Sequence, residues 1–204
     1  MSPADSSKYF TPIKPVEAQL VVKHSRFIAC LIPVTTRASI DEALENRRKK
    51  FSDATHHCFA WRLGFDEALV AFSSDASEPS GTAGKLILQA LESRRLTNVI
   101  CVLTRYFGGT KLGTGGLMRA YSAAAFAAID QAELVEAFPT ATLHLQYDYL
   151  FAGAVEKVLH QLNARVLSQD FAEKISCTIE IHRDGDERAR ELLKDACSGR
   201  ITID

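Results

Sequence analysis

A glycine-rich stretch between basic residues is the segment of this sequence best suited to holding an anion. Residues 105–121 read RYFGGTKLGTGGLMRAY, with five glycines in the nine positions 108–116. Glycine permits positive φ and close approach, so successive N–H groups can point into one concavity. We therefore predict a site for a phosphate group, contacted by Arg105, Gly108, Gly109, Lys111, Gly113, Thr114, Gly115, Gly116 and Arg119.

The same stretch also has a purely structural interpretation. A tight turn from a strand into a helix needs glycine for steric reasons, although one or two glycines would be enough. The stretch is not a Walker A loop, because Lys111 is followed by Leu112 and not by Ser or Thr. A helix that starts here would add its unpaired first N–H groups and its dipole, which favours the anion site.

A second segment, SSDASEPSGTAGKL at 73–86, combines two carboxylates with the start of a predicted helix. Asp75 and Glu78 could bind a metal ion or act as acid and base. Acidic residues near a helix amino terminus more commonly complement the helix dipole, and we favour that interpretation. Lys85 would add positive charge at this second helix start.

A third segment, DATHHCFAW at 53–61, has the alternation of a strand, with His56 and Cys58 on one face and His57 on the other. Two ligands without a third make a weak zinc signal, so we predict no metal site. His56 could contact phosphate if it faces the glycine-rich stretch, or be a hydrogen-bonded core residue if it faces inward. The sequence has no GxSxG or HExxH motif and no Cys/His/Asn arrangement, so we assign no catalytic residue and no cofactor.

Alternating strands and helices must position these segments. The compositions of residues 16–22 and 25–34 predict an antiparallel pair of strands. Residues 39–42, SIDE, match a capping box that opens a helix. Further elements are expected as strands at 55–65 and 68–72, a helix at 85–96, a buried strand at 98–107 and a helix at 117–134. The glycine-rich stretch therefore lies between a buried strand and a helix.

The chain from Pro139 onward reads as a second domain. Its predicted order is strand, helix, strand, strand, helix, strand, the βαββαβ order of a ferredoxin-like unit. One strand alternates apolar Ile175, Cys177, Ile179 and Ile181 with Lys174, Ser176, Thr178 and Glu180. One face of this sheet is therefore solvated or available to a partner. We expect an α/β (α+β) protein of two domains, residues 1–138 and 139–204.

The composition is that of an ordinary globular protein. Of the 204 residues, 47% are hydrophobic and 24% are charged, and a net charge of -1 gives no independent signal for nucleic acid. The five cysteines are odd in number and form no CxxC pair, which favours a reducing cytoplasm. No apolar run approaches the roughly 18 residues of a membrane span, so we expect a cytoplasmic protein without membrane contact. The sequence carries no signal for the oligomeric state.

Four segments together resemble the IMPACT (imprinted ancient) family, specifically its compact bacterial members of the YigZ type. They are KHSRF at 23–27, DATHHCFAW at 53–61, EPSGTAGK at 78–85 and RYFGGTKLGTGGLMRAY at 105–121. The resemblance implies an N-terminal domain similar to the left-handed βαβ fold of ribosomal proteins and GHMP kinases. It also implies a C-terminal domain similar to the last domain of elongation factor G. Relatives of these domains bind RNA or, in the kinases, phosphate, in agreement with the anion site.

Some features of the family do not carry over. Eukaryotic members regulate translation during amino-acid starvation by competing for an activator of a stress kinase, and they have an additional N-terminal domain that is not found in this sequence. Family members usually show an SDDGEP-like stretch, whereas Ala76 and Ser77 stand here where Asp and Gly are expected, and Leu86 replaces a frequent Pro. The missing carboxylate weakens any metal-based catalytic hypothesis.

Three functions follow as hypotheses. The first is a non-enzymatic protein of translation control that binds RNA or a ribosome-associated factor, with phosphate on the glycine-rich stretch, charge from Lys85, and Arg26 and His56 at the flanks. The second is an enzyme that acts on a phosphorylated metabolite or nucleotide, with Asp75 and Glu78 as metal or base groups. The third is a protein–protein adaptor that uses the exposed face of the C-terminal sheet. We favour the first.

Overall fold

The computed structural model describes residues 8–204 and shows two compact units, divided in the chain between Ala137 and Phe138. Both units combine strands and helices, so the expected two-domain α/β class is confirmed. Among the helices of this described part, none is both long and apolar enough to cross a membrane.

The first unit is built around a five-stranded sheet. Its strands are β2 (Val16–Val22), β3 (Ser25–Pro33), β4 (His56–Leu63), β5 (Val70–Ser74) and β6 (Val99–Tyr106). They lie in the order β2-β3-β6-β4-β5, and every neighbouring pair is antiparallel. The predicted pair β2–β3 is joined by Lys23 and His24, whose φ of 45° and 68° suit a tight hairpin turn.

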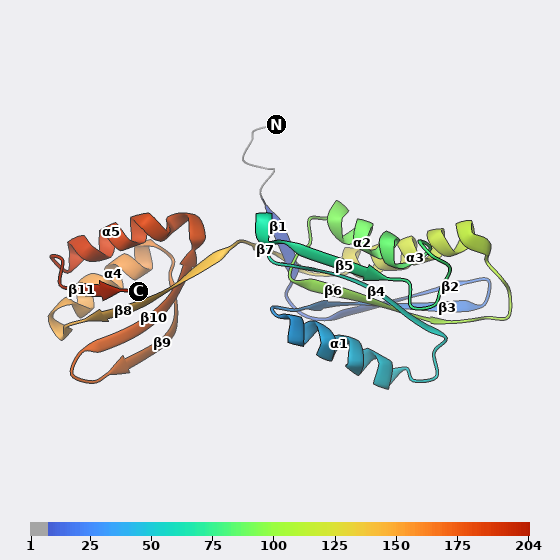
Figure 1. Cartoon of the computed structure of the whole chain (residues 1–204), viewed down its shortest axis with the longest axis horizontal. Coiled ribbons are helices and arrows are strands. Elements are labelled where there is room, and N and C mark those ends of the chain that lie inside the picture. Colours follow the sequence, from blue (N-terminus) through green and yellow to red (C-terminus); the bar gives the residue numbers. More distant parts are fainter. Residues whose placement is uncertain (1–7) are drawn as a thin grey trace, which may run out of the picture. The chain divides into compact units, whose positions relative to one another are not determined.

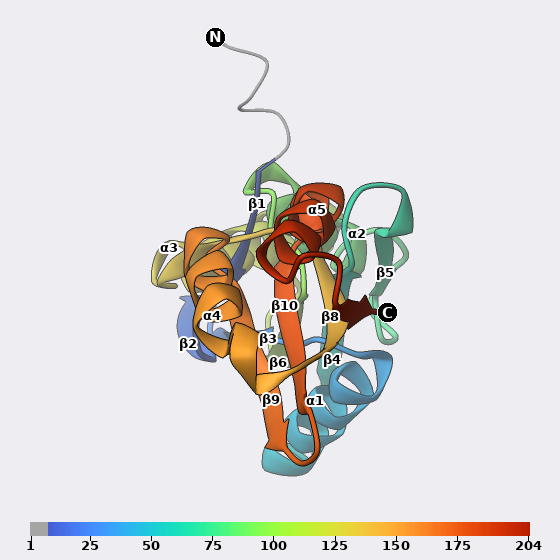
Figure 2. The ribbon, with the colours of Figure 1, turned by 90° about the vertical axis from the view of Figure 1, so that its left-hand side faces the viewer.

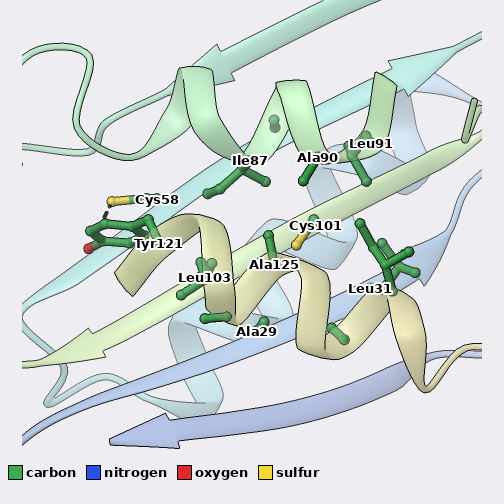
Figure 3. Close-up of a cluster of buried hydrophobic side chains, with 14 of the residues drawn as sticks. Ala29, Leu31, Cys58, Ile87, Ala90, Leu91, Cys101, Leu103, Tyr121 and Ala125 are labelled. Atoms are coloured by element: carbon green, nitrogen blue, oxygen red, sulfur yellow. Dashed lines mark hydrogen bonds between the residues drawn. The ribbon is translucent and has the colours of Figure 1, made fainter. Parts of the chain in front are cut away.

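Helices cover both faces of this sheet (Figure 1). Helix α1 (Arg37–Lys50) lies on one face, and α2 (Gly84–Ser93) and α3 (Gly113–Asp130) lie on the other. The central strand β6 is buried from Val99 to Arg105, as its continuous apolar composition predicts. On the α2/α3 face, Ile87 of α2 and Ala125 of α3 pack over Cys101 and Leu103 of β6 (Figure 3).

The capping box of α1 is one turn earlier than predicted. The N-cap is Thr36, whose hydroxyl accepts from the Ser39 amide (3.1 Å), while the Ser39 hydroxyl accepts from the Thr36 amide (3.1 Å). Ser39 is therefore the third residue of the helix and not its cap. The prediction was wrong by one turn because Ser and Thr can fill either position of the box.

Helix α3 also starts earlier than predicted, at Gly113 and not at Leu117. Glycine has low helix propensity, but packing of the buried side chains of α3 on the sheet overrides that preference. A second feature, the antiparallel ribbon of β1 (Tyr9–Pro12) and β7 (Leu134–Ala137), was not predicted. Its short strands carry Pro and mixed polarity, which hide the strand pattern from a sequence reading.

The second unit has the element order β8 (Thr140–Tyr147), α4 (Ala152–Gln161), β9 (Arg165–Phe171), β10 (Ile175–His182), α5 (Asp186–Ala196) and β11 (Ile201–Ile203). The strands form one antiparallel sheet in the order β11-β8-β10-β9. Helices α4 and α5 pack together on one face of it (Figure 2). The predicted alternation along β10 is confirmed, because Ile175, Cys177, Ile179 and Ile181 are buried against those helices.

Candidate anion-binding site

The glycine-rich stretch is the connection from β6 to α3 together with the first turn of that helix. Gly108 packs against the β2–β3 turn, where a Cβ would come within 2.1 Å of the main-chain carbon of His24. Its N–H donates to Ser25 Oγ (3.1 Å) and is therefore already used. Gly109 and Gly113 have φ of 81° and 69° with open space around them, so their role is conformational.

The main-chain N–H groups from Gly109 to Gly115 form no hydrogen bond with any of residues 8–204. Leu112 is the N-cap of α3, and no side chain caps the helix. The first N–H groups of a helix have no partner inside it, and the helix dipole adds positive potential at this end. The start of α3 therefore offers several free donors to an outside acceptor.

The exposed side chains of the glycine-rich stretch itself are basic or neutral. Lys111, Thr114 and Arg119 are all exposed, and residues 105–121 contain no Asp or Glu. Arg119 and Gly116 also line a cavity of about 270 Å³ between β2 and α3, and Lys23 lines it from the β2–β3 turn. Lys111, Thr114 and Arg119 therefore lie exposed at the start of α3, and Lys23, which we had not placed in the site, lines the same cavity as Arg119.

Arg105 has a different environment from the one we predicted. Its side chain is 6% exposed, and Nη1 donates to Glu78 Oε1 at 2.5 Å. The same carboxylate oxygen accepts from the Tyr121 hydroxyl (2.8 Å). Since both groups are buried, this ion pair joins β6, α3 and the β5–α2 loop, and Arg105 does not offer a free charge to a surface anion.

Asp75 caps the start of α2. Its Oδ1 accepts from the amides of Ala83 (2.9 Å) and Gly84 (2.8 Å), and its Oδ2 accepts from the amide of Gly81 (2.8 Å). Burial would raise the pKa of Asp75, but these three hydrogen bonds outweigh it and hold the pKa below its usual value. The carboxylate is a structural cap, in line with the structural interpretation from sequence, and Lys85 lies exposed beside it.

His56 and Cys58 face the α2/α3 side of the sheet. Because a carbonyl can only accept, His56 Nδ1 donates to the Ala76 carbonyl (3.1 Å), while Nε2 lies 3.7 Å from Glu78 Oε1. Burial raises the pKa of the Cys58 thiol to about 12, so it is not a reactive thiolate. Within residues 8–204, no group of three or more His, Cys, Asp or Glu side chains could hold a metal ion.

Arg26 lies on the other face of the sheet from α3. Its neighbour Phe27 contacts Tyr121 edge-to-face at 5.2 Å on the α3 side, and successive residues of a strand point to opposite faces. The Arg26 guanidinium stacks over the Tyr106 ring at 4.2 Å. Arg26 is therefore not gathered with the residues at the start of α3.

Sequence reasoning missed the structural partners of the site. Ser25 and Tyr121 were inside quoted motifs, yet nothing in their spacing shows that one holds Gly108 and the other holds Glu78. The β5–α2 loop supplies a weaker signal. Ala76 and Ser77 adopt φ of 45° and 72°, a conformation that favours glycine, and Ser77 is the position where the SDDGEP-like pattern led us to expect Gly.

Comparison with known proteins shows the family to which the chain belongs. Residues 23–129 match the Impact N-terminal domain, and residues 145–200 match a domain of unknown function, DUF1949. The chain is 31% identical to the IMPACT family member YvyE of Bacillus subtilis, over 96% of this chain and 89% of the relative. It is 33% identical to the IMPACT family member YigZ of Escherichia coli over 80% of each protein. A crystal structure of a hypothetical protein superposes with a TM-score of 0.71 at 29% identity, covering 97% of this chain and 96% of that one.

The first match includes the whole glycine-rich stretch and the loop that holds Asp75 and Glu78. The relatives extend over both units, and the resemblance stated from the four sequence segments is confirmed. This chain belongs to the IMPACT family.

Proposed function

We propose that this protein is a non-enzymatic component of translation control that binds RNA or a ribosome-associated factor, and that the start of α3 holds a phosphate group of the RNA. One observation carries the proposal. The amides from Gly109 to Gly115 have no acceptor among the described residues, and the surrounding charges at Lys111 and Arg119 are positive. Unpaired helix N–H groups beside cations form an anion site of the kind used for phosphates.

Binding is better supported than catalysis in the part of the chain that the structure describes. The two carboxylates that could act as metal or base groups already have structural partners, Asp75 with three amides and Glu78 with Arg105 and Tyr121. An enzyme that acts on a phosphorylated metabolite or nucleotide stays an alternative prediction. So does an adaptor that uses the open face of the second unit's sheet, which is hollowed by about 250 Å³ around His144 and Thr178.

Two finer parts of the prediction belong to this proposal. We propose that the units are related to the ribosomal-protein and GHMP-kinase fold and to the last domain of elongation factor G, a relation supported by the order of strands and helices. We also propose that the protein acts in the cytoplasm. All five cysteines are buried free thiols, which supports a reducing compartment.

The salt dependence of RNA binding tests the proposal. If three or four phosphates are neutralised on single-stranded RNA, log affinity should fall against log salt with a slope of about -2 to -3. Lys111→Ala should reduce the slope by about 0.7, and Lys157→Ala, an exposed lysine of α4, should leave it unchanged. A flat dependence, or equal slopes for the two variants, would contradict RNA binding through α3.

A further inference from the structure

A cavity of about 270 Å³ lies between β2 and α3, next to the free amides of the α3 start. Two segments far apart in sequence meet there. Lys23 comes from the β2–β3 turn, and Leu112, Gly116 and Arg119 come from the glycine-rich stretch and the first two turns of α3. The contact between Gly108 and the main chain of His24 fixes the turn against that stretch, so the cavity has a defined wall on each side.

The lining of the cavity has two chemical parts. The apolar part of the lining consists of Leu20 and Val22 from β2, and of Leu112, Ala120 and Ala123 from the start and first turns of α3. Its two charged residues, Lys23 and Arg119, are both cations, and no acidic residue lines it. Neither cation has an ion-pair or hydrogen-bond partner among residues 8–204. A ligand that fits must therefore combine an apolar body with a negative charge.

The volume limits the size of that body. The cavity is slightly smaller than the roughly 300 Å³ at which pockets for drug-sized ligands begin. It can therefore take one ring system, but not a long acyl chain or a folded peptide. A nucleotide has both properties, because the flat face of its base can stack on the Arg119 guanidinium above the apolar lining, and its phosphate carries the negative charge. The phosphate would lie toward the unpaired amides, because Leu112 and Gly116 of the α3 start line the cavity.

We infer that this cavity binds the base of a nucleoside monophosphate whose phosphate group lies at the start of α3. The inference rests on the proposed anion site and gives it a substrate class. The nucleotide is either free or the terminal nucleotide of an RNA, since both present one unstacked base next to a phosphate. The lining carries no group that reads a base edge in a fixed pattern, so the site discriminates weakly between bases.

The cavity can be filled without touching the phosphate site. Ala123 is exposed on α3 and lines the cavity, so Ala123→Leu should occupy the space of the base. Ala127→Leu is the matched control, because Ala127 lies one turn further along α3, is half-buried and does not line the cavity. Thermal unfolding of both variants should be measured first, to check that each is folded.

The experiment compares binding of adenosine 5′-monophosphate, ribose 5-phosphate and inorganic phosphate by isothermal titration calorimetry. The unmodified protein should bind the nucleotide about tenfold more tightly than ribose 5-phosphate. Ala123→Leu should abolish that ratio while binding of inorganic phosphate stays the same, and Ala127→Leu should keep it. Equal affinities for the nucleotide and ribose 5-phosphate, or a ratio unchanged in Ala123→Leu, would overturn the inference.

Two further measurements distinguish a free nucleotide from an RNA end, and distinguish failure of the base pocket from failure of the anion site. Two short RNAs, one with a 5′-phosphate and one with a 5′-hydroxyl, are tested as competitors of adenosine 5′-monophosphate. If only the RNA with the 5′-phosphate competes, the cavity binds an RNA end. If neither RNA competes, the cavity binds a free nucleotide. Lys111→Ala should weaken all three phosphate compounds together. If inorganic phosphate binds normally but the base gives no gain, the base pocket fails alone. If no phosphate compound binds at all, the anion site itself fails.

Discussion

Two glycine-containing junctions of the first unit, at the starts of α2 and α3, lead into an α-helix, and their chemistry is opposite. At the start of α2, the carboxylate of Asp75 accepts from three main-chain amides, so the junction is closed by the chain itself. At the start of α3, no described residue accepts from the amides between Gly109 and Gly115. The difference comes from one residue type, since the segment 73–86 holds acidic residues and 105–121 holds none.

The comparison shows that two similar glycine-containing loops leave their main-chain amides in different states. A glycine-containing loop before a helix always presents unpaired N–H groups. When an acid lies in the loop, those groups are satisfied internally and the loop becomes a rigid joint. When the loop is surrounded by lysine and arginine, the groups are left for an external anion.

The largest expected effect is on the closed junction. Glu78→Ala leaves the Arg105 guanidinium buried without its charge partner, and we expect the free energy of unfolding to fall by about 3–5 kcal/mol. Urea unfolding at neutral pH measures this. Glu92→Ala, at an exposed site on α2, should change the value by less than about 0.5 kcal/mol. A small loss for Glu78→Ala would mean that the buried ion pair does not hold the junction together.

A smaller effect concerns the cap of α2. Asp75→Asn should lower the free energy of unfolding by about 1–2 kcal/mol at pH 7, because the carboxylate no longer accepts from three amides. Its pKa is lowered in the folded state, so the stabilisation is present above the unfolded-state pKa and is lost as pH falls through the folded-state pKa.

The difference between Asp75→Asn and the unmodified protein should therefore shrink toward acidic pH in urea titrations. Asp41→Asn is the control, since Asp41 forms an exposed pair with Arg37, whose loss should change the free energy of unfolding by at most about 0.5 kcal/mol. A difference that grows as pH falls would contradict the assigned role of Asp75.

The smallest expected change in the free energy of unfolding comes from placing an acid at the start of α3, as the chain has at the start of α2. Thr114→Asp places a carboxylate in the first turn of α3, which should raise the free energy of unfolding by about 0.3–1 kcal/mol through the helix dipole. The same charge should weaken RNA binding. Thr114→Asn, of equal size but neutral, should leave RNA affinity nearly unchanged. Equal RNA affinity for the Asp and Asn variants would show that the α3 start does not meet the phosphate.

Much of this fold could be predicted from local patterns. The β2–β3 pair, the buried run of β6 and the alternation of β10 follow from residue periods that need no tertiary information. The start of α3 could not be predicted because Gly115 and Gly116 have low helix propensity, and only packing on the sheet makes them helical.

The anion site stays a prediction, and the structure shows which of its residues are available. Lys111 and Arg119 of the glycine-rich stretch are exposed, whereas Arg105 is not. The pairing of Arg105 with Glu78 joins residues distant in sequence, and it depends on the antiparallel register that sets Arg105 beside His56 and Phe27. No spacing rule in a single sequence carries that register. For the same reason we predicted Arg26 at the site, although its position in β3 directs its side chain to the face of the sheet opposite α3.

The most direct test of the central claim is a phosphate titration of the ¹⁵N-labelled protein followed by amide NMR. The free donors at Gly113, Thr114 and Gly115 should shift and saturate with phosphate, while the amides of Gly81 and Gly84, which donate to Asp75, should not move. Shifts of equal size at the two junctions, or none at the start of α3, would contradict the claim that one helix start is closed by the chain and the other is open to an anion.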